Sequence, residues 1–273
     1  MVMTFLKKKR KFKRIARDIK SIKIQGARNV ARQGIYAYSL FPTAKSKRKI
    51  LSLRPTEPML EKVLDMADKK SYKEIVKHFD EAQNKINLFL VKLIGKNNIL
   101  FTHCHSTNVI NALIYAKKKG KKFEVYNTET RPQDQGRKTA KHLTRNKIKV
   151  TMFVDSALDI ALSDDKGKKR VDKIFIGADA LLKEGVINKI GSKVIAKIAK
   201  SYKIPFYVVA DSWKFTNKKV PIEQRELNEV WDNAPKKIKI MNPAFEFVPK
   251  KYIKAIISEY GILSYDKFLK KVR

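Results

Sequence analysis

The only cysteine of the chain, Cys104, stands between His103 and His105. An apolar run over 99–101 leads into this segment, so the thiol follows the carboxyl end of an expected strand. Open α/β sheets form their ligand crevices at such strand ends. A thiolate there could act as a base if its pKa were lowered, and the N-terminus of the helix expected next would help to lower it. Lone cysteines are also common as inert packing residues, so both interpretations of Cys104 stay open.

The two flanking histidines suggest a metal site, but the pattern does not support one. Neighbouring residues on a strand point to opposite faces of the sheet. No distal pair of cysteines or histidines completes a ligand set. We therefore expect no metal and no cofactor.

Two further polar residues follow expected strands. Asp179 comes after an expected strand over 173–176, and Lys214 comes after one over 206–210. Lys214 could neutralise a phosphate, although it is one lysine among many. The alternative for Asp179 is a helix cap. The carboxyl group and the thiol form one site only if their strands are neighbours, which the spacing does not prove.

Several residues have the character of anion ligands. Gly26 comes at the start of a helical pattern, where free backbone N–H groups can bind an anion. Arg54 precedes Pro55 in a turn, and its planar guanidinium suits a phosphate, although a surface arginine is about as good an explanation. Asn188 and Lys189 precede another expected helix N-terminus.

The periodicity of the chain changes near Gly95. Before it the spacing of apolar residues is helical, with one long helix expected over 71–93, and after it strands and helices alternate. We predict an N-terminal helical domain over 1–95 and a Rossmann-like α/β domain over 96–273, with a mostly parallel, doubly wound sheet. The expected strands are 99–102, 123–126, 150–154, 173–176, 206–210 and 237–240, and the expected helices after residue 95 are 106–118, 136–145, 156–162, 191–202, 250–259 and 264–272.

The formal net charge of +36 over 273 residues permits three interpretations. These are a nucleic-acid surface, a field that steers an anionic substrate, and a general bias toward lysine. Because the charge is mostly lysine and is spread along the whole chain, the general bias is favoured and nucleic acid is not the expected partner. A single cysteine, no apolar run long enough for a bilayer and no signal peptide lead us to expect a cytoplasmic protein without a membrane partner.

Five blocks of the sequence resemble one superfamily in order and spacing. It contains the α, β and δ subunits of translation initiation factor 2B, methylthioribose-1-phosphate isomerase and archaeal ribose-1,5-bisphosphate isomerase. The blocks are THCHS, TETRPQDQG, IFIGADALLKEGVINKIGS, PFYVVADSWKF and MNPAFEFVP, and the resemblance covers about residues 26–261. The isomerases use a cysteine and an aspartate, whereas the regulatory subunits generally lack the cysteine. The THCHS block and the RPT turn resemble ribose-1,5-bisphosphate isomerase more than the methylthioribose enzyme.

The resemblance implies a role for each matching residue. Cys104 would be the proton acceptor and Asp179 the proton donor. In the isomerases the first binding loop usually begins with arginine, but here that position is Gln25, which gives up a charge-assisted bond to phosphate worth about 1.5–3 kcal/mol. Arg28 is the arginine that could reach back to replace it. The implied substrate contacts are Gln25, Gly26, Ala27, Arg28, Arg54, Ser106, Thr107, Asn108, Asn188, Lys189 and Lys214.

The activity that this resemblance implies is aldose–ketose isomerisation of ribose 1,5-bisphosphate to ribulose 1,5-bisphosphate, in the salvage of AMP. It also implies a homodimer or hexamer that assembles through the catalytic α/β domain over 96–273, with AMP as a candidate activator. The alternative function is that of a non-catalytic subunit that resembles initiation factor 2B and binds a nucleotide or sugar phosphate together with a protein partner. A basic RNA-associated protein is a third, less favoured alternative.

Overall fold

Five helices come first in the chain, and strands and helices alternate after them. The computed structural model describes residues 4–55, 57–164, 167 and 169–272. Within these residues, no strand precedes Asn98, as the periodicity predicts. The five helices are α1 (Phe5–Lys20), α2 (Ala27–Leu40), α3 (Ala44–Leu51), α4 (Pro58–Met66) and α5 (Tyr72–Leu93).

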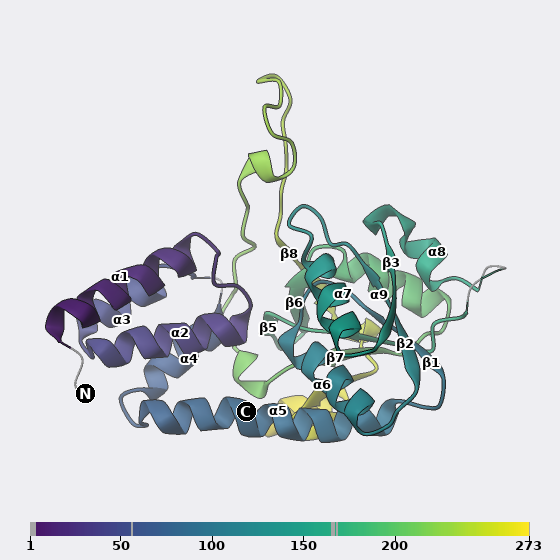
Figure 1. Cartoon of the computed structure of the whole chain (residues 1–273), viewed down its shortest axis with the longest axis horizontal. Coiled ribbons are helices and arrows are strands. Elements are labelled where there is room, and N and C mark those ends of the chain that lie inside the picture. The colour runs from purple at the N-terminus through teal and green to yellow at the C-terminus, as the bar shows by residue number, and fades with distance from the viewer. Residues whose placement is uncertain (1–3, 56, 165–166, 168, 273) are drawn as a thin grey trace.

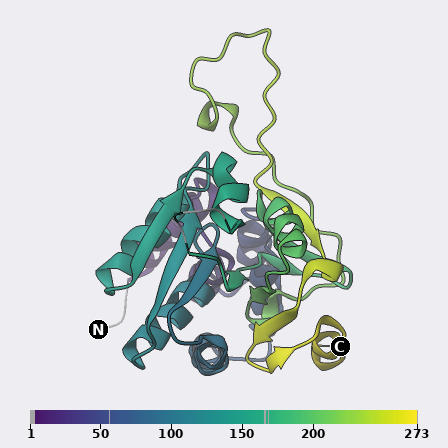
Figure 2. The same ribbon diagram turned by 90° about the vertical axis from the view of Figure 1, so that its right-hand side faces the viewer.

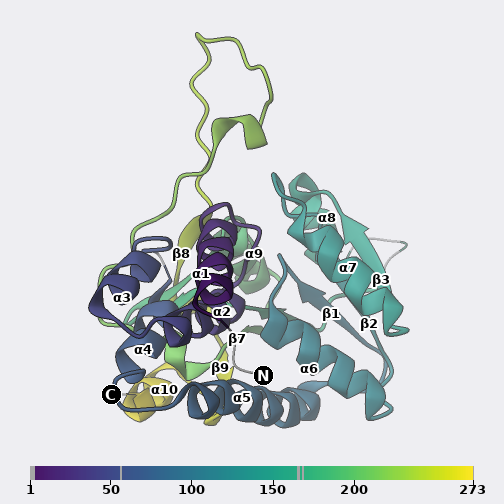
Figure 3. The same cartoon turned by 60° about the vertical axis from the view of Figure 1, so that its left-hand side comes forward.

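The helices α1 to α4 form a bundle because their apolar stripes meet in one core (Figures 1 and 3). Ile19 of α1, Val30 of α2 and Leu60 of α4 are fully buried there. The basic residues of α1 lie mainly on its exposed side. The first basic segment of the sequence is therefore a charged surface helix.

The longest helix, α5, belongs to two cores. A capping box fixes its start, in which Ser71 Oγ accepts a hydrogen bond from Glu74 N and the Glu74 carboxylate accepts one from Ser71 N. The first half of the helix buries Phe79 in the bundle, and the second half buries Ile86 against the sheet. In Figure 1 this helix runs beneath both parts of the molecule.

Seven strands form the main sheet in the order β10-β9-β7-β4-β1-β2-β3. Neighbouring strands are parallel except for β9 and β10, which pair antiparallel. The predicted mostly parallel sheet is thus confirmed. Its strands are β1 (Asn98–Thr102), β2 (Phe123–Thr128), β3 (Lys149–Phe153), β4 (Lys173–Ile176), β7 (Phe206–Val209), β9 (Ala255–Ser258) and β10 (Gly261–Leu263).

Helices cover both faces of this sheet, because successive strand residues face opposite ways (Figure 2). Phe101 packs in the core under α8, α9 and α10, whereas Leu100 packs in the core under α5, α6 and α7. The sheet is therefore doubly wound, as predicted. The helices are α6 (Thr107–Lys118), α7 (Gln135–Arg145), α8 (Leu158–Leu162), α9 (Ser192–Ser201) and α10 (Tyr265–Val272).

The winding direction reverses between β1 and β4. From β1 the chain proceeds outward through β2 to β3, and then returns to place β4 on the other side of β1. At such a reversal the crossover connections diverge and leave a crevice beyond the carboxyl ends of the two central strands. Topology therefore locates a ligand site after Thr102 and Ile176.

A small sheet and a long arm complete the molecule. The strands β5 (Ala180–Leu181), β6 (Gly185–Lys189) and β8 (Phe245–Pro249) pair antiparallel. The arm is residues 216–244, light green at the top of Figure 1, and it extends away from the body. Its two legs pair at the base, where Arg225 N donates to Asn242 O over 2.9 Å and Ala244 N donates to Glu223 O over 2.8 Å.

Two predicted elements are wrong. The helix predicted over 250–259 is a 3₁₀ turn, η4 (Lys250–Tyr252), followed by strand β9. All four residues of β9 are buried, and a strand buried on both faces has no alternation that distinguishes it from a buried helix. The strand predicted over 237–240 lies in the arm without regular pairing, because its alternating lysines and isoleucines have no neighbouring strand.

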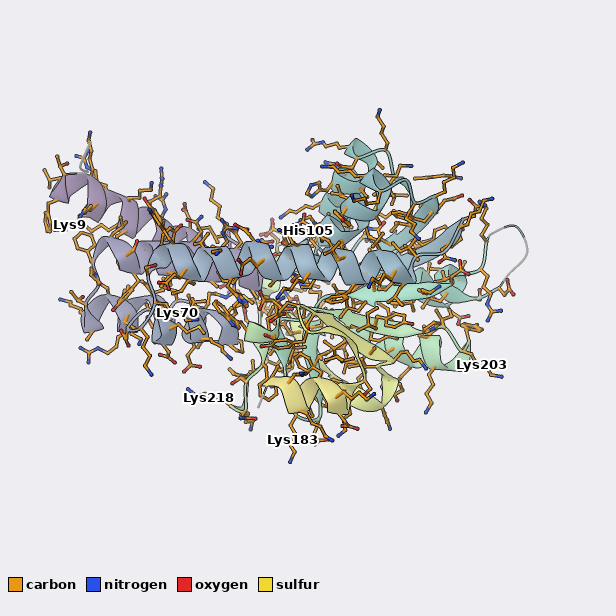
Figure 4. The ribbon with its side chains drawn as sticks, turned by 90° about the horizontal axis from the view of Figure 1, so that it is seen from below. Lys9, Lys70, His105, Lys183, Lys203 and Lys218 are labelled. Atoms are coloured by element: carbon orange, nitrogen blue, oxygen red, sulfur yellow. The ribbon has the colours of Figure 1, made fainter. Side chains whose placement is uncertain are left out.

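The positive charge is distributed over the whole surface. Figure 4 labels exposed lysines on separate parts of the molecule, from Lys9 on α1 to Lys203 after α9. This distribution agrees with a general bias toward lysine rather than one basic face. None of the described helices is both long and apolar enough to cross a membrane.

Candidate functional site

A cavity of about 120 Å³ lies where the bundle, the small sheet and the carboxyl ends of β1 and β4 meet. All of the side chains that the sequence predicted for the site line this cavity, although they come from segments far apart in the chain. They are Gln25, Gly26, Ala27, Arg28, Arg54, Cys104, Ser106, Thr107, Asn108, Asp179, Asn188, Lys189 and Lys214.

The strands that precede Cys104 and Asp179 are neighbours. Strand β1 pairs parallel with β4, and each of the two residues follows the end of its strand. Gly177 allows the loops to approach, because a Cβ at this position would lie 2.5 Å from Ser106 Oγ. The condition that spacing could not prove is therefore met, and Asp179 lies in the cavity rather than at a helix cap.

The backbone of Cys104 is held in the left-handed region, at φ 63°. Such a conformation costs a non-glycine residue about 1–3 kcal/mol and persists only where its surroundings fix it. Cys104 N donates to Thr130 Oγ1 over 3.0 Å, and Thr139 Oγ1 donates to Cys104 O over 2.6 Å. Both peptide groups of Cys104 are thus anchored, and the half-buried thiol keeps one position at the cavity wall.

The flanking histidines form part of this support. His103 Nε2 donates to Ile190 O over 2.8 Å, so its Nδ1 accepts from Thr128 Oγ1 over 2.6 Å. Burial lowers the pKa of His103 and keeps the ring neutral. His105 Nδ1 contacts Thr139 Oγ1 at 3.0 Å, and burial with the neighbouring His142 lowers its pKa to about 4. Both rings therefore brace the turn in uncharged form.

The thiol is not pre-ionised, contrary to the expectation from its position before α6. Burial raises the pKa of Cys104 to about 11, and the carboxylate of Asp179 adds to this effect. Lys189 acts in the opposite direction, but it does not outweigh burial. The pKa of Asp179 is also raised by burial, against the opposing charges of Lys214 and Arg54. Burial therefore disfavours the charged form of each group.

Buried cations surround the pair. Lys189 comes from β6 and Lys214 from the turn η2 (Ser212–Lys214), and both are at most 5% exposed. Lys214 Nζ donates to Ala178 O over 2.5 Å, which orients the ammonium group beside Asp179. Burial lowers the pKa of Lys214, and Asp179 and Asp211 partly restore it. The cavity thus offers positive charge that protein groups only partly neutralise.

On the bundle side, Arg54 donates hydrogen bonds to two carboxyl groups. Its NH2 group donates to Glu57 Oε1 over 3.3 Å and to Glu223 Oε2, on the arm, over 3.0 Å. The guanidinium is 9% exposed at its side chain. The arm and the bundle therefore meet at a residue that the resemblance assigns to phosphate binding.

Two helix N-termini also face the cavity. Gly26 precedes α2 at φ 81°, a conformation that favours glycine, and Ser106 caps α6 by accepting from Val109 N over 3.5 Å. The first N–H groups of an α-helix have no partner within the helix, and together they attract anions. The backbone at Ala27 and Thr107 can thus contribute to anion binding from opposite walls.

A lysine lies beside Gln25. Lys138 Nζ donates to Gln25 Oε1 over 3.5 Å, and Gln25 Nε2 donates to Gln133 Oε1 over 3.3 Å. Arg28 does not reach back, because it donates to Asp80 over 2.8 Å and to the amide oxygen of Gln83 over 3.1 Å. The expected replacement by Arg28 is therefore wrong, and Lys138 of α7 stands next to the loop instead.

A cluster of possible metal ligands lies near the cavity, formed by His78, Asp211 and Glu259, whose ligand atoms are within 4.8 Å of one another. Protein partners already bind each carboxylate. Asp211 Oδ1 accepts from Trp213 N and contacts His78 Nε2, and Glu259 accepts from both the backbone and the hydroxyl of Ser212. These contacts indicate that the cluster holds neighbouring segments of the protein together.

Sequence reasoning missed several residues of the cavity wall. Glu57 was visible three residues after Arg54, but its burial is a property of the fold. Gln133 lies in the recognised TETRPQDQG block, although only the fold brings it to the wall. Arg225, at the base of the arm, gave no local signal, and Phe245 lies in the recognised MNPAFEFVP block without being singled out.

The fold and the cavity define an α/β protein with an N-terminal helical bundle and a ligand site at the reversal of the sheet. The model of the initiation factor 2 subunit family matches residues 45–265, and the chain belongs to this family.

Curated relatives include isomerases. The ribose 1,5-bisphosphate isomerase of Archaeoglobus fulgidus is 32% identical, with 91% of this chain and 88% of the relative covered. The ribose 1,5-bisphosphate isomerase of Thermococcus kodakarensis is 33% identical, over 91% of this chain and 89% of the relative. Among solved structures, the translation initiation factor eIF-2B of Pyrococcus horikoshii OT3 superposes with a TM-score of 0.81 at 26% identity, over 93% of this chain and 96% of that one. Similarity therefore extends to both kinds of family member.

Proposed function

We propose that this protein is an aldose–ketose isomerase that converts ribose 1,5-bisphosphate to ribulose 1,5-bisphosphate. The observation that carries the proposal is the meeting of Cys104 and Asp179 in one cavity, after the adjacent strands β1 and β4. A binding subunit needs no thiol and carboxyl group beside a bound sugar, whereas moving a proton between adjacent carbons needs an acid and a base. The names of the relatives in Archaeoglobus and Thermococcus give independent support.

The reaction begins with ring opening. In the sugar bisphosphate the C1 oxygen carries a phosphoryl group, so the ring opens by cleavage of the bond between C1 and the ring oxygen. Transfer of the Cys104 proton to Asp179 produces the thiolate and the carboxylic acid together. The high pKa of Cys104 makes its thiolate a strong base, and the raised pKa of Asp179 lets its carboxyl group hold the transferred proton. Asp179 gives its proton to the ring oxygen, and the C1–oxygen electron pair leaves with that oxygen.

Proton transfer at carbon follows. The C1 cation that ring opening leaves is stabilised by the lone pair of its phosphate-bearing oxygen, and it acidifies the proton at C2. The Cys104 thiolate takes that proton, and the electrons form a C1–C2 double bond. The thiol then returns the proton to C1, and the Asp179 carboxylate takes the proton from the C2 hydroxyl. The product is the ketone, and the enzyme is left with the Cys104 thiolate and the Asp179 carboxylic acid. Return of the Asp179 proton to the thiolate restores the starting forms of both groups.

The surrounding groups supply binding and charge. Arg54, Lys189 and Lys214 attract the two phosphates, and the helix N-termini at Ala27 and Thr107 donate N–H groups. Asn188 and Asn108 offer amide groups to the sugar hydroxyls. No step requires a group that the chain does not itself provide.

We further propose a cellular role in the salvage of AMP, with AMP as an activator, and assembly through the α/β domain into a homodimer or hexamer. A cytoplasmic location fits this role. Native mass spectrometry with and without AMP tests both the assembly and the binding of the nucleotide.

The decisive experiment is turnover of ribose 1,5-bisphosphate by the purified protein, followed by ³¹P NMR in heavy water. We expect ribulose 1,5-bisphosphate to form, with part of the C1 hydrogen exchanged for deuterium by the thiol. Tight binding of the sugar bisphosphate without any product would contradict the proposal and favour the non-catalytic subunit.

A further inference from the structure

The carboxyl group of Glu57 lies in the cavity but has no part in the proposed reaction. Glu57 is the N-cap residue of α4, and its side chain is 2% exposed. It lines the cavity beside Arg54, and its Oε1 accepts from the Arg54 NH2 group over 3.3 Å. Its Oε2 is buried and has no hydrogen-bond partner among the described residues.

Arg54 has a hydrogen-bond donor without a partner, which complements the unpartnered oxygen of Glu57. Its NH2 group is used by two carboxyl groups, whereas its Nε is buried and has no partner in the part of the chain that the structure describes. Buried polar atoms without partners are rare in native proteins. Arg54 and Glu57 both line the cavity, and each has one hydrogen-bonding atom that no described protein group uses.

The charge around Glu57 selects the chemistry of a ligand atom that binds there. A phosphate oxygen accepts from Arg54 Nε, but it repels Glu57 Oε2 unless that oxygen carries a proton. Burial raises the pKa of Glu57 to about 8, the charges of Asp179 and Glu223 add to this, and those of Arg54 and Lys214 oppose it. At pH 7 the carboxyl group is therefore mostly neutral and can donate a hydrogen bond.

We propose that Glu57 recognises a phosphate of the ligand as a neutral carboxylic acid, donating a hydrogen bond from Oε2 to the phosphate oxygen that also accepts from Arg54 Nε. The identity of the ligand as a sugar bisphosphate rests on the proposed function, but the binding mode does not depend on turnover. The proton on Glu57 prevents a third negative charge from facing the phosphate beside Asp179 and Glu223. Glu57 is thus a specificity residue for dianionic phosphate.

The test is calorimetric titration with ribulose 1,5-bisphosphate between pH 7 and pH 9.5, where the phosphates stay dianionic. The wild-type Kd should rise above pH 8, by up to about tenfold per pH unit, because the complex keeps a proton that the free protein loses. Glu57→Gln carries an N–H donor at every pH, so its Kd at pH 7 should stay within a few fold of wild type and the extra rise should vanish. Glu57→Ala should raise the Kd at pH 7 by about tenfold or more. Deprotonation of Lys214 in this pH range would raise the Kd of wild type and of Glu57→Gln alike, so the difference between the two proteins reports on Glu57.

The matched control is Glu61→Gln, which removes a carboxylate of the same helix that pairs with Lys218 outside the cavity. It should behave as wild type, and circular dichroism checks that every variant is folded. If the Kd of wild type and of Glu57→Gln depends on pH in the same way, the proposal is overturned. A wild-type Kd that does not change with pH also overturns it, since that is the result expected if a ligand hydroxyl faced an ionised Glu57. Binding with the expected pH dependence but without turnover contradicts only the proposed function. Absence of binding by the folded wild-type protein overturns both.

Discussion

The imidazole ring of His78 lies flat against the indole ring of Trp213, with ring centroids 3.4 Å apart and planes 3° apart. His78 belongs to α5, and Trp213 belongs to the turn η2 that carries Lys214 into the cavity. Asp211 strengthens the contact, because its Oδ1 accepts from Trp213 N over 2.9 Å and lies 3.2 Å from His78 Nε2. The long helix is thus joined directly to a wall of the site.

Replacing His78 with alanine should destabilise the protein by about 1–3 kcal/mol, since it removes a ring contact and a buried hydrogen bond. It should also raise KM, because the turn that positions Lys214 loses its support. Urea unfolding measures the first effect and steady-state kinetics the second. His142→Ala, at an exposed position on α7, should change stability by no more than about 0.5 kcal/mol. Equal stability of the two variants would contradict the structural role of His78.

Cys104→Ser should lower kcat by about 10²–10⁴ and leave KM nearly unchanged, because a hydroxyl is a much poorer acceptor of a carbon-bound proton. Asp179→Asn should have a similar effect through loss of the acid. Circular dichroism and thermal unfolding should show a native fold for both. An unchanged rate in folded Cys104→Ser would refute the proposed base.

The raised pKa of Cys104 predicts slow alkylation at neutral pH. Only the thiolate reacts, and below a pKa of about 11 its fraction rises about tenfold with each pH unit. The rate of carboxamidomethylation by iodoacetamide, measured by mass spectrometry, should follow this slope from pH 7 to pH 10. Because the chain has one cysteine, each label reports on this thiol alone.

Two variants test the causes of that pKa. Lys189→Met removes a charge that lowers the pKa of Cys104, so alkylation at pH 9 should slow. Asp179→Asn removes a charge that raises it, so alkylation should accelerate. Opposite signs would mean that the three side chains do not interact as described.

The pairing of Gln25 with Lys138 predicts that the lost arginine is only partly replaced. Lys138→Met should raise KM for the bisphosphate about threefold to tenfold, since it removes the cation beside the loop. Gln25→Arg should lower KM, because a guanidinium can bind phosphate directly. Lys141→Met, at another exposed position of α7, serves as the control and should have no effect. An unchanged KM in Lys138→Met would show that this lysine does not act on the ligand.

Local patterns were sufficient to predict where Cys104 and Asp179 stand, because each follows a short apolar run of the length of a buried strand. Their adjacency was not predictable, since it depends on β4 crossing to the far side of β1. Glu57 was missed for a similar reason. Its neighbour Arg54 was recognised, but the pKa of Glu57 is raised by its burial and by the charges of Asp179 and Glu223, and Glu223 stands 166 positions further along the chain on the arm.

The two errors in secondary structure have opposite physical causes. Strand β9 is buried on both faces and lacks the alternation that would reveal it. The segment over 237–240 has alternation, but no strand lies beside it to accept its hydrogen bonds. Periodicity reports which side chains meet an apolar environment, and it does not report whether a partner strand exists.

Helix α5 is continuous over 22 residues and is packed into both cores. Because one continuous helix is packed into both cores, we expect little rotation of the bundle against the sheet. The arm contacts the cavity in a different way, since Glu223 accepts from Arg54 and pairs with Arg225. We therefore expect ligand exchange to depend on this contact. The rate of product release should therefore depend on arm residues and be insensitive to changes along the outer surface of α5.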